Sequence, residues 1–458
     1  MIQRTLWILV VVLSTISVRA QDELVLLSPH WEGVRKEFTD AFQKDYLAKT
    51  GREVDLKWLD VGGASDILKY IRSEYKNKPD GIGVDLFFGG GTDPYIELKR
   101  QGVLVSYRVP DDILQELKTD LNGVPLFDAD YTWYAATMAG FGIIYNKVVL
   151  AKLGLPEPRT WADLAHPKVF SWVGSADPRK SGSVHMAYEI ILQAYGWEKG
   201  WQIVTAMGAN VRGFASNAAQ TPKDVALGEV AYGLAIDSYA WAQVREAGEE
   251  MIGFVMPEGL TLVNGDAIGM LKGAPNSSVA EHFINFVLSE PGQKLWLLKQ
   301  GEPDGPQSFE LSKFSVLPAL YDRVGKRSAV KLNPFTWHSD FKYDAPIGSA
   351  RWGVVNDLMG TQIIDVHAQL QEKWHQGVLS GHADAVLIGK VPIDESQAGS
   401  LAQGWRDPAV RNQTLQDWSA FARDKYGAAG VGLAQNIPVI IVLFSGVYMF
   451  VFSRRKRR

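Results

Sequence analysis

The sequence predicts an α/β fold in which strands and helices alternate around a mostly parallel sheet. Residues 24–27 form a short apolar run, and residues 33–47 place apolar side chains on one helical face. Residues 54–58 alternate as a half-buried strand does, residues 65–71 open a second helix, and residues 84–88 form a third strand. Short strands separated by helices of this length are typical of βαβ units, whose strands run parallel.

A second set of alternating elements follows along the chain. We expect strands at residues 141–145, 170–173 and 231–236, and an amphipathic helix at residues 183–195. A capped helix is expected at residues 276–288, after another stretch of strand character. The alternation therefore continues over most of the body.

The last part of the body has a different character. From residue 333 the strand signals fade, and residues 354–378 have the apolar spacing of one or two helices. The sequence predicts a helical extension over residues 333–430, between the body and the C-terminal end.

The first residues have the composition of a secretory signal peptide. A positive charge at Arg4 precedes an apolar run over residues 6–13, and Val18 and Ala20 are small side chains suited to a cleavage site. The run is shorter than the roughly 20 residues that a bilayer-spanning helix needs. We predict a signal peptide over residues 1–20, cleaved after Ala20, with an uncleaved anchor as the alternative.

The far end predicts a membrane anchor. Residues 431–452 are apolar apart from Gln435 and Asn436, and they are long enough as a helix to cross about 30 Å of hydrocarbon. The basic tail at residues 453–458 should stay in the cytoplasm by the positive-inside rule. We therefore expect a single-pass protein of the cell membrane with its body on the periplasmic or extracellular side. The alternative, a buried helix followed by a nucleic-acid-binding tail, fits the all-basic flank poorly.

The composition excludes several kinds of site. The 458 residues contain no cysteine and carry a formal net charge of -4. An exported chain without cysteine has no disulfide, no thiolate metal site and no cysteine nucleophile. Because the only dense basic run is the membrane flank, we expect no nucleic-acid partner.

Several stretches together resemble the extracellular solute-binding proteins of ABC importers, in the branch that includes ferric-iron-binding proteins. Their order and spacing over residues 24–317 carry the resemblance. The extension and the anchor depart from the common pattern of that family. The stretches are Ser28-Pro-His-Trp-Glu-Gly33, Val84-Asp-Leu-Phe-Phe-Gly-Gly-Gly91, Gly142-Ile-Ile-Tyr-Asn146, Ser175-Ala-Asp-Pro-Arg-Lys-Ser-Gly-Ser183, Gly265-Asp-Ala-Ile268 and Ala280-Glu-His-Phe-Ile-Asn-Phe-Val-Leu-Ser-Glu-Pro-Gly-Gln293.

The resemblance implies a two-lobed periplasmic-binding-protein fold of type II, with a hinge and a cleft between the lobes. Lobe one would comprise residues 21–130 and 256–332, and lobe two residues 131–255. The implied function is binding without catalysis. A small solute or a metal would be captured between the lobes and passed to ABC permease and ATPase subunits, with no cofactor. Independently of the family, loops at the carboxyl ends of parallel strands are where open α/β sheets bind ligands.

The helix expected at residues 183–195 suggests an anion site. Ser181, Gly182 and Ser183 precede or open it, where free backbone N–H groups and the positive helix end favour negative charge. The simpler interpretation is that Ser181 or Ser183 only caps the helix. The motif also matches the ligand loop of the family, so we predict ligand contact here.

The loop after residues 84–88 also suits an anion. Gly89, Gly90, Gly91 and Thr92 offer backbone amides with little side-chain bulk, which fits a phosphate, phosphonate or carboxylate group. The alternative is a flexible turn.

Further candidates come from the resemblance. His30 stands where iron-binding relatives have a histidine ligand. Asp237 and Tyr239 stand where those relatives have two adjacent tyrosines, with Ser238 at the first of them. His30 and Tyr239 would be metal ligands only if the solute is ferric iron, and the loss of anionic oxygens argues against iron. His30 bonded to its own loop is the alternative. Asp237 could pair with an amine, which suggests a zwitterion such as an aminophosphonate.

Other functions stay open. His30, Asp237 and Ser183 can be drawn as the triad of an exported hydrolase, but the chain has no G-x-S-x-G elbow and no H-E-x-x-H motif. A solute sensor that reports to a membrane partner is the third possibility. The sequence therefore predicts a membrane-tethered receptor for a small anionic or zwitterionic solute or ferric iron.

Overall fold

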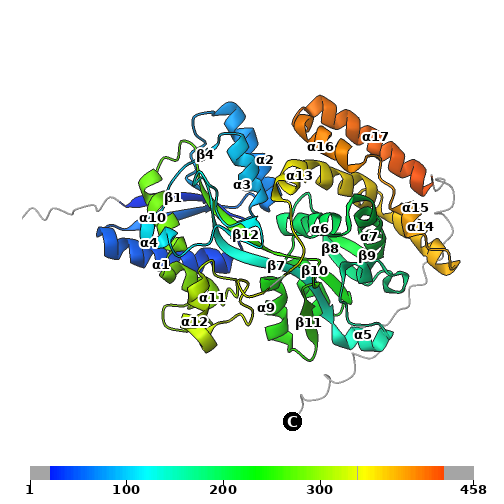
Figure 1. Ribbon diagram of the computed structural model, residues 1–458, viewed down its shortest axis with the longest axis horizontal. Coiled ribbons are helices and arrows are strands. Elements are labelled where there is room, and N and C mark those ends of the chain that lie inside the picture. Colours follow the sequence, from blue (N-terminus) through cyan, green and yellow to red (C-terminus); the bar gives the residue numbers. More distant parts are fainter. Residues whose placement is uncertain (1–20, 338, 428–458) are drawn as a thin grey trace, which may run out of the picture.

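The computed structural model describes residues 21–337 and 339–427, and it confirms the predicted α/β class. Neighbouring strands of the main sheet follow the order β2-β1-β3-β12-β7-β10-β8-β9, with β4 beside β12 and β11 beside β7 (Figure 1). These strands are β1 (Asp22–Leu27), β2 (Val54–Leu59), β3 (Leu86–Phe88), β4 (Leu104–Val105), β7 (Tyr134–Asn146), β8 (Val173–Ala176), β9 (Val211–Ala215), β10 (Tyr232–Ile236), β11 (Ile252–Val255) and β12 (Val263–Leu271). Strands β5 (Asp120–Leu121) and β6 (Val124–Pro125) pair separately.

The first lobe is the part built on β1, β2 and β3. Its helices are α1 (Glu32–Thr50), α2 (Ala64–Asn77), α3 (Asp93–Arg100), α4 (Asp111–Leu114), α10 (Ser277–Leu288), α11 (Glu290–Leu297) and α12 (Pro318–Val324). Helix α1 forms because Val34, Phe38 and Phe42 recur on one face and are buried, and it ends at Gly51, whose φ of 71° is the left-handed conformation that glycine adopts readily.

The second lobe is built on β8, β9, β10 and β11. Its helices are α5 (Lys147–Leu153), α6 (Gly182–Tyr195), α7 (Trp197–Asn210), α8 (Gln220–Ala226) and α9 (Asp237–Ala247). The sequence expectation of a strand at residues 170–173 is displaced, because a 3-10 turn at Pro167–Val169 delays the strand to Val173. Helix α9 begins at Asp237, directly after β10, so Asp237 and Tyr239 lie in the first turn of a helix.

The centre of the sheet differs from the predicted parallel arrangement. Parallel pairing holds at β1 with β2 and β3, and at β8 with β9 and β10. However, β7 runs antiparallel to β10, β11 and β12, and β12 runs antiparallel to β3. Strand β7 is buried along its whole length, so it lacks the polar alternation that reveals a strand, and only residues 141–145 were expected.

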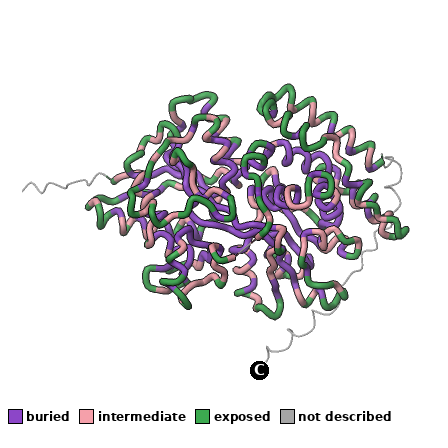
Figure 2. Tube along the Cα trace, viewed as in Figure 1, coloured by how far each residue is buried: buried purple, intermediate pink, exposed green. Residues whose placement is uncertain are grey.

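Strands β7 and β12 connect the two lobes. Tyr134 and Met138, early in β7, belong to the core of the first lobe, whereas Phe141, Ile143 and Tyr145 belong to the core of the second. Figure 2 shows the buried trace running along these central strands and into α6 and α7. One continuous strand therefore passes from one core to the other beneath the candidate site.

The C-terminal extension is helical and shares the core of the second lobe. It consists of α13 (Ala345–Met359), a π-helical turn (Gly360–Ile364), α14 (His367–Leu379), α15 (Ala385–Ile388), α16 (Glu395–Gly404) and α17 (Pro408–Tyr426). Arg351 of α13 forms a buried ion pair with Glu189 of α6 at 2.7 Å. The Tyr343 hydroxyl, just before α13, donates to Asp93 of the first lobe at 2.6 Å. The extension thus contacts both lobes.

The predicted ends of the chain lie outside the described residues. These are the signal peptide at residues 1–20, residues 428–430 of the expected extension, the anchor at residues 431–452 and the basic tail at residues 453–458. Within residues 21–337 and 339–427, no helix is both long enough and apolar enough to cross a membrane. The domain bounds stated above stay a prediction.

Candidate functional site

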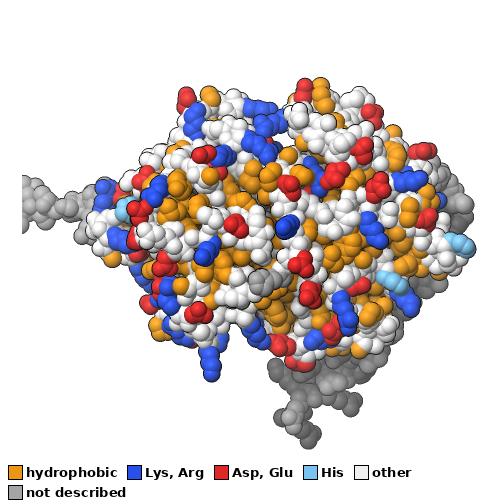
Figure 3. All heavy atoms as spheres, in the orientation of Figure 1, with side chains coloured by type: hydrophobic (Ala, Val, Ile, Leu, Met, Phe, Trp, Pro, Cys, Tyr) orange, Lys and Arg blue, Asp and Glu red, His pale blue; other side chains and the backbone are white. Residues whose placement is uncertain are grey.

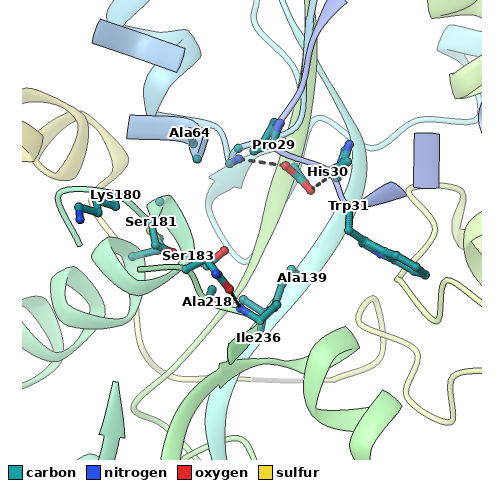
Figure 4. A pocket seen from close by; sticks show the side chains of 18 of the residues that line it. Pro29, His30, Trp31, Ala64, Ala139, Lys180, Ser181, Ser183, Ala218 and Ile236 are labelled. Carbon is teal, nitrogen blue, oxygen red and sulfur yellow. Dashed lines mark hydrogen bonds and ion pairs between the residues drawn. The ribbon is translucent and has the colours of Figure 1, made fainter. Parts of the chain in front are cut away.

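A cavity of about 550 Å³ lies between the lobes. Its wall combines the loops after β1, β2 and β3 with the start of α6, the loop after β9, and residues of β7, β10 and β12. Figure 4 shows Lys180, Ser181 and Ser183 on one side, with Pro29, His30 and Trp31 on another. Of the predicted residues, His30, Gly90, Gly91, Thr92, Ser181, Gly182, Ser183 and Tyr239 line the cavity, whereas Gly89 and Asp237 do not.

The start of α6 is open toward the cavity. Ser181 caps the helix, because its side chain accepts a hydrogen bond from the Val184 N–H at 3.4 Å. Among the described residues, the N–H groups of Gly182 and Ser183 have no protein acceptor. A Cβ at residue 182 would lie 3.0 Å from the Cβ of Ala64, so a larger side chain would crowd this wall. The cap interpretation is confirmed, and it leaves two N–H groups for an anion.

The glycine loop does not present the row of bare amides expected from the sequence. Gly89 donates its N–H to the Ala267 carbonyl at 2.7 Å, and Gly91 donates to a carboxylate oxygen of Asp266 at 3.0 Å. Gly89 has a φ of 100°, and a Cβ there would lie 2.7 Å from the His30 ring. The glycines are therefore required for close packing around His30 and Asp266, and most of their hydrogen-bonding capacity is already used.

A buried charged network forms one wall of the cavity. The Asp266 carboxylate contacts His30 Nε2 at 3.1 Å and Lys313 Nζ at 2.7 Å. Burial alone would raise the pKa of Asp266, but the charge of Lys313 and the contact with His30 hold that pKa well below its usual range. Burial lowers the pKa of His30, against the opposing effect of Asp266. Lys313 is buried, yet Asp266 raises its pKa above the ordinary value. We therefore assign an ionised Asp266–Lys313 pair beside a neutral imidazole.

This network changes the interpretation of His30. Its backbone N–H donates to the Ser28 hydroxyl at 3.2 Å, but its ring binds Asp266 rather than its own loop. The ring also packs against Phe88 and Trp296. His30 is thus paired with Asp266, not with Asp237, so the hydrolase triad drawn from the sequence is not assembled.

Asp237 and Tyr239 lie at the start of α9, in different surroundings. Asp237 is buried, and one of its carboxylate oxygens accepts the Ser238 N–H at 2.7 Å. Burial raises the pKa of Asp237 to about 7, against the lowering effect of backbone hydrogen bonds and Lys313. Tyr239 lines the cavity, and burial raises the pKa of its phenol. Asp237 is therefore not placed to meet an amine in the cavity.

Ferric iron has few partners here. In the described part of the chain, no group of three or more His, Asp or Glu side chains is placed to hold a metal ion. His30 Nε2 and Asp266 already bind each other, which leaves Tyr239 as the remaining predicted ligand. Ferric iron prefers several hard anionic oxygens, so these residues fit it poorly.

Several cavity residues were not found by sequence reasoning. Arg35 lines the cavity and donates to the backbone carbonyls of His30, at 2.7 Å, and Ser28, at 3.1 Å. Lys180 adds positive charge to the wall, whereas the charge of Lys313 is paired with that of Asp266. Lys180 and Asp266 lie inside family-like stretches and could have been singled out there. Lys313 has no local sequence signal.

The two lobes touch at the edge of the cavity. The Ser65 hydroxyl of α2 donates to the Pro178 carbonyl at 3.4 Å, and Lys69 Nζ donates to the Arg179 carbonyl at 3.1 Å. A Cβ at Gly63 would lie only 2.0 Å from the Lys180 carbonyl oxygen. The structure therefore has the lobes in contact around the cavity.

Comparisons with known proteins agree with this architecture. A model of the family described as bacterial extracellular solute-binding protein matches residues 39–314. An uncharacterised protein of Haemophilus influenzae is 26% identical over 319 residues, which cover 66% of this chain and 86% of that protein. Two solved structures show the same fold.

The first is the periplasmic binding protein AfuA from Actinobacillus pleuropneumoniae with fructose-6-phosphate bound. It has a TM-score of 0.58 and 18% identity over 79% of this chain and 99% of that one. The second is iron-bound HitA from Pseudomonas aeruginosa, with a TM-score of 0.55 and 20% identity over 73% of this chain and 98% of that one.

Proposed function

This chain belongs to the bacterial extracellular solute-binding proteins, and on that premise we propose that it captures a small anionic solute between its two lobes for an ABC-type importer. In this proposal the open receptor binds the solute in the cavity, and contacts from both lobes favour the closed form. The closed form then docks on a permease that works with an ATPase.

One observation carries the choice of an anion. The N–H groups of Gly182 and Ser183, at the positive end of α6, face a cavity that Lys180 also lines. The charges of Arg35 and Lys313 in the same wall are already paired with Asp60 and Asp266. A phosphate, phosphonate or carboxylate group would complete the hydrogen bonds of these N–H groups. AfuA, which shares the fold, is described with a sugar phosphate bound, and this supports a solute with a phosphate group.

Ferric iron is the less favoured solute. HitA is described as iron-bound. In this chain, His30 and Asp266 bind each other, and they would have to break that contact before either could coordinate iron. A zwitterion paired with Asp237 is also less favoured, because Asp237 does not line the cavity. We therefore rank a phosphorylated or carboxylated anion first.

The membrane tether remains part of the proposal on sequence grounds. Residues 431–452 would hold the receptor at the outer face of the cytoplasmic membrane after export through the signal at residues 1–20. The extension would then connect that anchor to the second lobe, whose core it shares.

The test is a thermal-shift screen of the purified full chain against sugar phosphates, phosphoglycerate, alkylphosphonates, polyamines and ferric citrate. A solute at about 100 times its Kd stabilises the folded chain by about 2.7 kcal/mol, which is about 5–10 °C for a lobe-sized unit. We expect a phosphate- or carboxylate-bearing solute to give this shift. A shift with ferric citrate alone, or turnover of phosphate esters, would contradict the proposal.

A matched pair of variants locates the binding. Gly182→Val should abolish the thermal shift, because a side chain at residue 182 would contact Ala64 and block the space in front of the two free N–H groups. Gly213→Val is the control, because no atom of the described residues outside its chain neighbours lies within 4 Å of a Cβ at residue 213. An equal thermal shift in the two variants would show that the solute binds away from the start of α6. Copurification with a permease and ATPase, rather than with a kinase, would favour import over sensing.

A further inference from the structure

A second cavity of about 1300 Å³ lies outside the candidate site. It is a groove with α2 and α3 of the first lobe on one side and α13, α16 and α17 of the extension on the other. Trp352 of α13 lines both cavities, so the groove adjoins the cleft between the lobes. Figure 3 shows Lys and Arg side chains gathered at the top of the molecule, between α2 and α16.

The groove has a large excess of positive charge. Its wall contains eight basic side chains and two carboxylates. Three of the basic side chains have their own partners: Lys69 pairs with Asp66, Arg179 with Asp177 and Asp365, and Arg411 with Asp357. The basic residues are Lys69, Arg72, Lys76, Arg100, Arg179, Lys272, Arg406 and Arg411, and the carboxylates are Glu97 and Asp357.

The excess of positive charge in the groove is concentrated around one carboxylate, that of Glu97. Glu97 pairs with Arg72 at 3.3 Å and with Arg100 at 3.3 Å, and it also forms an ion pair with Arg406. Three guanidinium groups therefore share a single negative charge. In the described part of the chain, Lys76 and Lys272 of the same wall have no carboxylate partner within 4 Å, and Lys272 Nζ donates to the Pro79 carbonyl at 3.1 Å.

The guanidinium of Arg72 is incompletely satisfied. Its Nε is buried and has no hydrogen-bond partner among the described residues. Burial lowers the pKa of Arg72, ahead of the opposing charge of Glu97. An anion in the groove would supply both the missing acceptor and the missing negative charge.

We propose that this groove is a second anion site, for a ligand that carries at least two negative charges on phosphate or carboxylate groups. Arginine forks match the oxygens of such groups, and the guanidinium groups here come from two sides of the groove. Arg72 and Arg100 belong to the first lobe, whereas Arg406 follows α16 of the extension. A bound dianion would therefore tie the extension to the first lobe without occupying the cleft.

The test uses inorganic pyrophosphate as the probe, titrated calorimetrically into the full chain at constant ionic strength. The groove variant is Lys76→Gln with Arg406→Gln, both at exposed positions, and Arg72→Gln is the second variant. The control is Lys36→Gln with Lys49→Gln on α1, which removes the same charge far from the groove. We expect the groove variants to weaken binding at least about tenfold and the control to stay within about twofold. Absent binding in the unmodified chain, or equal losses in groove and control variants, would overturn the proposal.

Two further arms separate this site from the cleft and identify the source of the anion. Gly182→Val should leave groove binding intact. If Gly182→Val removes pyrophosphate binding while the groove variants keep it, the groove proposal fails and the proposed function stands. Vesicles of phosphatidylglycerol and phosphatidylcholine are the last arm. If the unmodified chain binds the vesicles and the groove variants do not, the ligand of the groove is a lipid headgroup. If the chain binds pyrophosphate but not the vesicles, the ligand is a free anion.

Discussion

Replacing Lys313 with methionine tests the buried network of the cavity wall. Lys313 Nζ lies 2.7 Å from the Asp266 carboxylate, and both side chains are almost fully buried. Without Lys313, the partners of the Asp266 carboxylate among the described residues are His30 at 3.1 Å and the Gly91 N–H at 3.0 Å. The imidazole of His30 is held neutral by burial, so the variant contains a buried carboxylate without a counter-charge.

The expected loss follows from that geometry. Two unit charges 2.7 Å apart attract by about 6 kcal/mol at an effective dielectric constant of about 20, before desolvation is counted. Removing one partner of a buried pair typically costs about 3–5 kcal/mol, because the other charge is left unpaired. We expect a loss of about 3 kcal/mol at pH 7, which corresponds to a fall in Tm of about 6–12 °C for a lobe-sized unit.

The loss should depend on pH. In the unmodified chain the pKa of Asp266 is depressed, so its stabilising effect is present above the ordinary carboxyl pKa and is lost only as pH falls through the depressed value. Without Lys313 that pKa rises, and His30 beside an unpaired carboxylate takes up a proton more readily. The difference in Tm between variant and unmodified chain should therefore shrink from pH 8 to pH 5.

Calorimetric melting of the full chain at both pH values measures these differences. Lys294→Met is the matched control: Lys294 pairs with two exposed carboxylates, Glu290 and Asp304, so its loss should cost under about 1 kcal/mol. Adding Asp266→Asn to Lys313→Met should recover most of the loss, since no buried charge then remains. A loss no larger than that of Lys294→Met, or no recovery in the double variant, would show that the buried Asp266–Lys313 pair does not stabilise the fold in this way.

Three other predictions follow from the same geometry. Gly63→Val should weaken solute binding at least about tenfold and change the Tm of the unliganded chain little. The new Cβ would lie 2.0 Å from the Lys180 carbonyl oxygen and keep the lobes apart. An unchanged Kd in calorimetry would contradict this prediction. Arg351→Met should cost about 3–5 kcal/mol in thermal melts, because Glu189 is left buried and charged, and adding Glu189→Gln should restore more than half. Burial raises the pKa of Asp237 from 3.8 to about 7 in the folded chain. Between these pH values Asp237 is protonated more in the folded than in the unfolded chain, so the free energy of unfolding falls as pH rises. Asp237→Asn should therefore match the unmodified chain at pH 4 and exceed it in Tm at pH 8, and a constant difference across pH would count against this assignment.

The start of the first lobe could be predicted from the sequence because its signals are local. Residues 24–27, 33–47 and 54–58 carry the periodicity of one element each, and β1, α1 and β2 form there. The start of α6 belongs to the same class, since a serine cap and a following glycine are adjacent in the chain. The capped start of α6 could therefore be predicted from the sequence, whereas anion binding there stays a prediction.

The central strands were not predictable in the same way. Strand β7 is buried on both faces, so its sequence contains no alternation from which a direction or a partner could be inferred. Its antiparallel pairing with β12 joins segments more than a hundred residues apart. Only the packed sheet decides that arrangement.

The family resemblance, the α/β class and the capped start of α6 follow from residues that are neighbours along the chain, so they could be predicted. Which polar groups remain free to bind a ligand depends instead on tertiary contacts. His30 and Asp266 are separated by 236 positions and lie 3.1 Å apart, and Asp266 also accepts the Gly91 N–H. A predicted metal ligand and one amide of the predicted anion loop therefore already have protein partners. A buried polar group binds whichever partner the fold brings within reach, and that partner is not encoded near it in the chain.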